Sequence, residues 1–126
     1  MSIAYSHFNV TMNATALRLA EYVRQDGACP YTDWFDRLDS QAAAKVATAT
    51  LRLSMGNTSN LKWLGGIGEL KIDWGAGYRV YLGRDDDRVI VLFGGGTKRT
   101  QNKDIQRARA LHAEFKTRKA TLTCRK

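Results

Sequence analysis

The stretch "ELKIDWGAGYRVYL", residues 69–82, decides the fold because its apolar side chains recur at every second position. The alternation runs through Leu70, Ile72 and Trp74, stops at the small residues 75–77, and then resumes. A period of two is typical of β-strands that bury one face. The stretch therefore predicts two antiparallel strands joined by a hairpin.

The length of the hairpin loop determines which residues face one another. A two-residue loop would pair Ile72 with Arg79 and mix the two faces, whereas a three-residue loop at 75–77 keeps the apolar side chains together. We therefore expect the pairs Trp74 with Tyr78, Ile72 with Val80, and Leu70 with Leu82. A tight turn near Asp85 and Asp86 then returns the chain as "VIVLF". This third strand would set Val89, Val91 and Phe93 beside Leu82, Val80 and Tyr78.

The opposite face of this predicted meander is polar. In the same register Asp73 lies across from Arg79, and Lys71 lies across from Tyr81. A solvated face with cross-strand ion pairs is the simplest explanation of such a pattern.

The next stretch, "GGGTKRTQNKDI" (residues 94–105), gives this face a second interpretation. It carries Lys98, Arg99 and Lys103 to the end of the sheet where Arg79 is expected. The positions of its glycines and lysine do not match a nucleotide-binding P-loop. The stretch therefore predicts an anion site of another kind, beside the N-terminus of a helix.

Segments before these strands predict one further strand and two helices. "ALRLAEYV" (residues 16–23) has the pattern of a strand. Pro30 suits the first turn of a short helix, in which Trp34 and Leu38 share a side. Asp39 or Ser40 caps a second helix that ends near Met55, before Gly56 and Asn57. The residues expected to face the core from this second helix are Ala43, Val46, Ala47 and Leu51.

The chain is expected to end in a helix and a tail. Residues 101–119 form the predicted helix, with Ile105, Ala108, Leu111 and Phe115 on one side. Residues 120–126 have little to bury and are expected to be a flexible basic tail, while residues 1–15 are expected to be a flexible leader. The domain itself is expected at residues 16–119.

Composition restricts the function classes. The 126 residues, 44% hydrophobic and 25% charged, suit a single globular domain. The net charge of +8 comes from residues 98–126, and this favours a polyanionic partner, although a solubilising tail would carry the same excess. Cys29 and Cys124 suggest neither a disulfide framework nor a zinc site. No apolar run is long enough to span a membrane, so we expect a cytoplasmic protein without a metal or other cofactor.

Four segments follow one another along the chain: "YVRQDGACPYTDWFDRLDS", "RLSMGN", "GIGELKIDWGAGYRVY" and "GGGTKRTQNKDIQRARA". In their order and spacing they resemble the RelE/ParE superfamily of bacterial toxins, specifically its HigB-like branch, also described as addiction module killer proteins. The resemblance implies a small α+β domain in which an antiparallel sheet carries two N-terminal helices on one face, with a C-terminal helix. It also implies a toxin that cuts messenger RNA on the ribosome and is neutralised by a cognate antitoxin, often a helix-turn-helix protein.

Matching the motifs position by position carries the family's site onto this chain. Lys71 matches the basic residue before the hairpin, Arg79 the arginine of "GYR", and Lys98 the lysine after the glycines. Three departures occur: Thr97 replaces an acidic residue, Arg99 adds a cation, and Ala76 replaces a proline. The further residues expected to bind substrate are Tyr81, Arg99, Thr100, Gln101 and Lys103.

The resemblance implies a metal-independent reaction in which the 2′-hydroxyl of RNA attacks the adjacent phosphorus. Fixed cations stabilise the developing charge, and Lys71, Arg79 and Lys98 would supply them. Either Glu69 or Lys71 is the expected base, because His7 lies in the leader and His112 is expected to be structural.

Aromatic side chains and rival functions complete the sequence-based expectations. Tyr81 and Trp63 are candidates to stack on bases, although Trp63 could equally cover the edge of the sheet. Trp34, Trp74 and Tyr78 are expected in the core. Two other functions stay open: a DNA gyrase inhibitor like the ParE branch, and a nucleic-acid-binding domain without catalysis.

Overall fold

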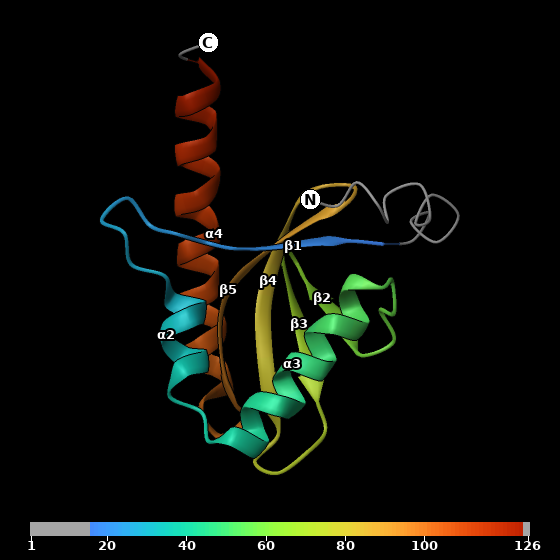
Figure 1. Ribbon diagram of the computed structural model, residues 1–126. Coiled ribbons are helices and arrows are strands. Elements are labelled where there is room, and N and C mark those ends of the chain that lie inside the picture. The colour runs from blue at the N-terminus through green and yellow to red at the C-terminus, as the bar shows by residue number, and fades with distance from the viewer. Residues whose placement is uncertain (1–15, 125–126) are drawn as a thin grey trace.

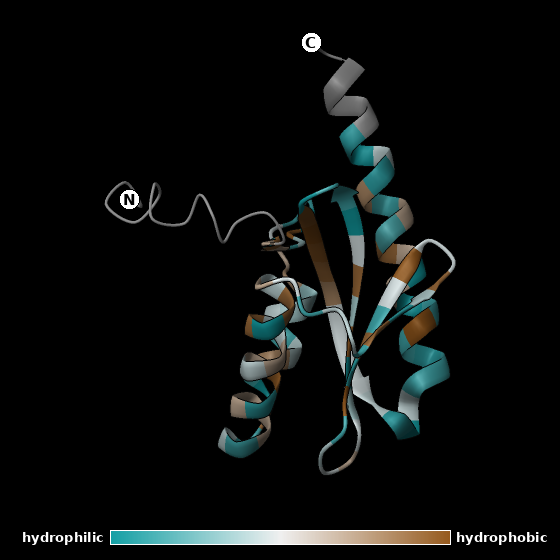
Figure 2. Ribbon diagram, turned by 90° about the vertical axis from the view of Figure 1, so that its right-hand side faces the viewer, coloured by the Kyte–Doolittle hydropathy of each residue, from teal (hydrophilic) through white to brown (hydrophobic). Residues whose placement is uncertain are grey.

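The computed structural model describes residues 16–124, with side chains described as far as residue 119. Five strands form one sheet in the order β1-β5-β4-β3-β2, and helices cover both of its faces (Figures 1 and 2). The strands are β1 (Arg18–Glu21), β2 (Leu61–Leu64), β3 (Ile67–Ile72), β4 (Tyr78–Asp86) and β5 (Val89–Thr97). The helices are α2 (Pro30–Asp36), α3 (Ser40–Ser54), the 3₁₀ turn η2 (Lys98–Thr100) and α4 (Gln101–Cys124). The expected α+β class is confirmed, while the expected leader, 1–15, lies outside the described residues.

The sheet is mixed and not wholly antiparallel. β1 runs parallel to β5, with Arg18 opposite Val89 and Glu21 opposite Leu92. The three remaining pairs of strands are antiparallel. The antiparallel prediction is therefore wrong at this edge, because the sequence pattern of β1 shows a strand but not its partner.

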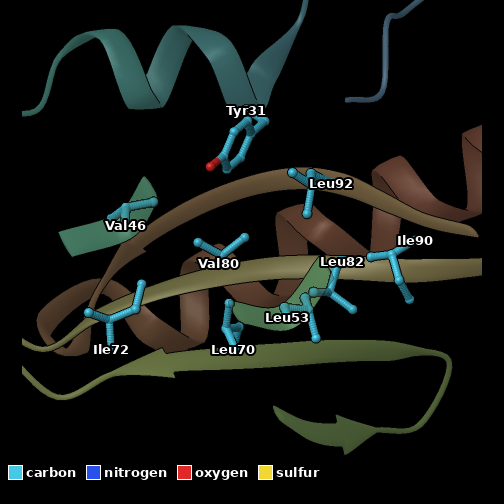
Figure 3. Close-up of a cluster of buried hydrophobic side chains, with 9 residues drawn as sticks. All are labelled: Tyr31, Val46, Leu53, Leu70, Ile72, Val80, Leu82, Ile90 and Leu92. Atoms are coloured by element: carbon cyan, nitrogen blue, oxygen red, sulfur yellow. The ribbon is translucent and has the colours of Figure 1, made fainter. Parts of the chain in front are cut away.

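Helices α2 and α3 pack on the same face of the sheet, as expected. Nine buried side chains form this core, and six of them point from β3, β4 and β5 toward Tyr31 on α2 and toward Val46 and Leu53 on α3 (Figure 3). Trp34, Trp74 and Tyr78 are partly buried against this core. Their predicted place in the core is confirmed.

The buried side of α3 differs from the expected one. The helix begins where predicted, because the Asp39 side chain accepts a hydrogen bond from the Ala42 amide at 2.8 Å. Ala42, Val46 and Leu53 are buried, whereas Leu51 is 59% exposed. Ala43 is half-buried, and Ala47 is also exposed. Small apolar residues lie on two sides of this helix, so its sequence is compatible with either orientation.

Helix α4 covers the second face of the sheet. Ala108 and Leu111 pack on Tyr81, Val91 and Phe93, with Ile105 and Phe115 beside them. The predicted buried side of this helix is confirmed, but the helix continues to Cys124, so the boundary expected at residue 119 is wrong. We expected this face of the sheet to be open to solvent, but α4 covers it and a second hydrophobic core lies between them (Figure 2).

An ionic latch holds α4 against the chain that follows β1. The Glu114 carboxylate accepts hydrogen bonds from the Tyr22 hydroxyl at 2.6 Å and from Arg24 at 2.8 and 3.1 Å. Arg118 also donates to the Val23 carbonyl at 2.8 Å. Beyond this latch, α4 extends past the end of the sheet (Figure 1). No helix within residues 16–124 is long and apolar enough to cross a membrane.

The β3–β4 hairpin is displaced by two residues from the predicted register. Ile72 pairs with Tyr78, and Lys71 pairs with Arg79, so that residues 73–77 form the connection. Two turn hydrogen bonds explain the longer loop, from the Trp74 amide to the Ile72 carbonyl at 2.9 Å and from the Gly77 amide to the Trp74 carbonyl at 3.0 Å. A displacement of two keeps each side chain on its expected face but changes its cross-strand neighbour.

A β-bulge changes the faces of the third strand. Between Tyr81 and Leu82 the pairing of β4 with β5 shifts, so that Leu82 lies opposite Leu92. Ile90 and Leu92 consequently join the core under α2 and α3. Val91 and Phe93, which we expected there, face α4. The sequence analysis also missed β2, whose four residues show no clear alternation.

Candidate active site

A buried polar cluster lies on the α4 face of the sheet, where the sequence places its candidate catalytic residues. Glu69 on β3 and Arg79 on β4 are each 6% exposed. The Glu69 Oε2 atom accepts hydrogen bonds from the Tyr81 hydroxyl at 3.1 Å and from the Gln101 amide at 2.8 Å. It also lies 3.7 Å from the Arg79 Nε atom. The predicted residues Glu69, Arg79, Tyr81 and Gln101 therefore form one cluster, but it is enclosed.

Electrostatics explain how this cluster tolerates burial. The Arg79 guanidinium balances the Glu69 charge and donates from Nη1 to the Gly77 carbonyl at 2.8 Å. Burial raises the pKa of Tyr81, and the neighbouring Glu69 charge raises it further. Tyr81 therefore stays neutral, and its hydroxyl donates a hydrogen bond to Glu69. The Arg79 Nε atom has no hydrogen-bond partner among the described residues.

Exposed cations surround this buried cluster at the hairpin end of the sheet. Lys71 lies opposite Arg79, and Gly96 lies opposite Arg79 on its other side. Two strand spacings separate Lys71 from Gly96, which is about 10 Å. A methyl group placed on Gly77 would lie 3.2 Å from Arg79 Nη1 and 3.5 Å from the Lys98 Cβ atom. Lys71 and Lys98 therefore flank Arg79 on two sides.

The cations that follow β5 are available to a ligand. Lys98, Arg99 and Lys103 are exposed, and none of them pairs with a carboxylate of the described residues. Thr100 is different, because its hydroxyl makes a short hydrogen bond to Asp104. We infer that the three cations can contact an anion directly and that Thr100 primarily orders the start of α4.

The aromatic residues proposed to stack on bases do not meet at this site. Tyr81 is 1% exposed, so its ring has no free face for a base. Trp63 is 41% exposed, but it lies over the other face of the sheet, near Leu61 and Leu82, with Arg84 at 5.3 Å from its ring. The expected stacking role of Tyr81 therefore has no support in this arrangement.

Packing accounts for two of the three glycines that suggested a phosphate cradle. A methyl group on Gly95 would lie 2.5 Å from the Trp34 ring, and one on Gly96 would collide with Asp104. Gly94 has open space instead. These residues line a pocket of about 390 Å³ between α2, β5 and α4, with Arg37 and Arg107 among its other lining residues. The sequence analysis missed this pocket, and the glycines were its only sign.

The described histidine, His112, lies apart from the cluster of Glu69 and Arg79. The His112 ring packs at 5.5 Å from the Phe93 ring, and burial lowers its pKa. The expectation that His112 is structural is consistent with this position, while His7 lies outside the described residues. Among the side chains that the structure describes, residues 16–119, no three of His, Cys, Asp or Glu group together as metal ligands. The ionisable side chains that the structure brings together at this end of the sheet are those of lysine and arginine, with the buried Glu69 carboxylate.

Together, the sheet covered on both faces and the exposed lysine and arginine residues at its hairpin end define a small basic α+β domain with a cluster of cations at one end of the sheet. No family model matches the chain. An uncharacterized protein of Haemophilus influenzae is 41% identical to it over 87 residues, which is 68% of this chain and 88% of that protein. The chain belongs to the same family as this protein.

Proposed function

We propose that the protein is the toxin of a type II toxin–antitoxin system, a HigB-like member of the RelE/ParE superfamily that cuts messenger RNA on the ribosome in the cytoplasm. The observation that carries this proposal is the pair Lys71 and Lys98, which are exposed on either side of the buried Arg79. A phosphate between them would meet two free ammonium groups in front of a fixed guanidinium. The sequence motifs "GYRVY" and "GGGTKRT" support the family.

The reaction that suits such a site is internal transfer at a phosphodiester. The 2′-oxygen forms a bond to phosphorus as its proton passes to water, the bond from phosphorus to the 5′-oxygen breaks, and that oxygen takes up a proton from water. Charge accumulates on the phosphate oxygens in the transition state, and cations held in place stabilise it without reorganisation. Lys71 and Lys98 are therefore assigned to the scissile phosphate.

The buried residues Arg79 and Glu69 have a different role from the exposed pair Lys71 and Lys98. We expected Arg79 to clamp the phosphate directly, but its 6% exposure leaves it little surface for a ligand. Glu69 was a candidate base, yet its Oε2 atom already accepts from Tyr81 and Gln101. We therefore assign Arg79 and Glu69 as positioning residues. They hold the ends of β3 and β4 and the first turn of α4 in one arrangement.

Substitution of Lys98 tests this function. Purified Lys98→Ala protein, added to translating ribosomes at saturation, should cut message about a hundredfold more slowly, because one preorganised stabiliser of developing charge is lost. The cuts are measured by mapping 5′ ends. Lys116→Ala removes an exposed cation from the far part of α4 and should cut at the wild-type rate.

Other outcomes would point to other functions. Wild-type protein that cuts no message but arrests supercoiling would be a gyrase inhibitor. Protein that does neither but binds RNA would be a binding domain without catalysis. Neutralisation by a helix-turn-helix protein encoded beside it would support the toxin assignment independently of the reaction.

A further inference from the structure

A second basic groove lies on the other side of β3, between this strand and α3. Its volume is about 360 Å³. Lys45 and Arg52 line it from α3, and Lys71 is among the residues that line it from β3. Asn57 and Asn60, before β2, add amide groups. None of the sequence motifs pointed to this groove.

The periodicity of α3 places the cations of this groove together. Lys45, Thr48, Ala49 and Arg52 recur at three- and four-residue intervals, so they form one row along the helix. This row lies next to the buried row of Val46 and Leu53. The groove therefore follows the edge along which α3 packs on the sheet.

The charge of the groove is not compensated within the protein. Lys45, Arg52 and Lys71 are exposed, and none forms an ion pair with a carboxylate of the described residues. Asp73 is the one acidic lining residue. The Lys45 ammonium lies 5.7 Å from the centre of the Trp74 ring, which restricts where that charge can move. An excess of fixed positive charge in a groove favours a polyanion.

Lys71 connects this groove to the candidate active site. It lines the groove and also stands opposite Arg79 in the β3–β4 pair. β2 pairs with β3 as far as Leu70, and the Lys71 amide donates to the Asn60 carbonyl at 3.0 Å, so the paired edge of β3 ends at Lys71. A strand of RNA that crosses Lys71 can pass around this edge from one face of the sheet to the other.

We propose that the groove of Lys45, Arg52 and Lys71 binds backbone phosphates of the RNA strand next to the scissile phosphate. This inference rests on the proposed function, because that function makes RNA the ligand at Lys71. The groove holds the phosphates of the flanking nucleotides and does not read bases. It raises affinity for the strand and takes no part in bond cleavage.

Binding to an RNA that cannot be cut tests the groove separately from the nuclease. The probe is a fluorescent single-stranded oligonucleotide with 2′-O-methyl groups, which removes the attacking hydroxyl. For the double variant Lys45→Ala, Arg52→Ala, fluorescence anisotropy should show about tenfold weaker binding. The slope of log affinity against log salt concentration should become shallower by about 1.4, since each phosphate contact on a single strand contributes about 0.7.

A control of equal charge and a shorter probe sharpen the result. The variant Arg37→Ala, Lys116→Ala removes two exposed cations from α2 and α4, and its binding should stay within about twofold of the wild type. A trinucleotide covers the active site alone, so it should bind the groove variant and the wild type equally. Equal losses in both double variants, or no loss in the groove variant, would overturn the proposal.

Failure of the groove and failure of the nuclease assignment give different results. If the wild type cuts message but the groove variant binds the long probe normally, the groove is wrong and the nuclease stands. If the wild type cuts nothing but the groove variant still loses affinity, the groove is an RNA site in a protein that is not a nuclease.

Discussion

Glu69 and Arg79 are the charged side chains that are buried in the described part of the protein, and each depends on the other. Removing one partner of a buried ion pair leaves the other charge without compensation. The sheet alternation correctly predicts that both residues share a face with Tyr81. It cannot show that a helix far along the chain covers this face.

Substitution of Arg79 should therefore destabilise the fold. Arg79→Ala leaves the Glu69 carboxylate buried without its cation, which costs about 3 kcal/mol of unfolding free energy. Urea unfolding followed by circular dichroism measures this cost. Lys71→Ala, at the opposite but exposed position on β3, should change the free energy by less than about 0.5 kcal/mol. Similar values for the two variants would show that the buried pair contributes little.

At the scale of single helices and strands, the sequence signals for helix ends were more reliable than the prediction of which side of a helix is buried. Asp39, Pro30 and Gly56 mark helix ends through contacts within a few residues, so the start of α2 and both ends of α3 could be predicted, whereas α2 ends at Asp36, before the Leu38 that was expected to be part of it. The buried side of α3 could not, because both of its apolar rows fit a helix. The parallel partner of β1 is set by packing between segments far apart in the chain.

A matched pair of substitutions tests the observed orientation of α3. Leu53 is 0% exposed and Leu51 is 59% exposed, and the two lie on the same helix. Leu53→Ala should cost about 3 kcal/mol of unfolding free energy, since it leaves a cavity in the core. Leu51→Ala should cost less than about 0.5 kcal/mol. Thermal or urea unfolding of both variants decides between the two faces, and the reverse order would restore the predicted one.

The latch on α4 should make the free energy of unfolding depend on pH in the acidic range. Hydrogen bonds from Arg24 and then Tyr22 hold the pKa of Glu114 below its usual value of 4.5. The latch therefore stabilises the fold above pH 4.5, and this contribution disappears as the pH falls through the lower pKa of the folded state.

The variant Glu114→Gln isolates this effect. At neutral pH it should be less stable than the wild type, and the difference should narrow as the pH is lowered below 4.5. Chemical denaturation at a series of pH values gives both curves. A difference that stays constant down to low pH would mean that the Glu114 charge does not act through the latch.

At the scale of the whole molecule, the helices α2 and α3 on one face and α4 on the other enclose the sheet (Figure 2). The sequence predicted a site on an open face of the sheet. Because α4 covers that face, the candidate site lies at the end of the sheet, where Lys71 and Lys98 are exposed. The sequence could predict the residue types and their shared face. The covering by α4 and the groove beside α3 depend on how whole layers pack, which no local pattern specifies.

The parallel pairing of β1 with β5 also determines when the sheet can be completed during synthesis of the protein. β1 is made near the start of the domain, but its partner in the sheet is made near the end. Pairing of segments so far apart waits until both have left the ribosome. Gln101, which closes the buried cluster on Glu69, comes later still. A nascent chain of this topology therefore lacks the finished cluster of Glu69, Arg79 and Gln101 until β5 and the first turn of α4 have left the ribosome.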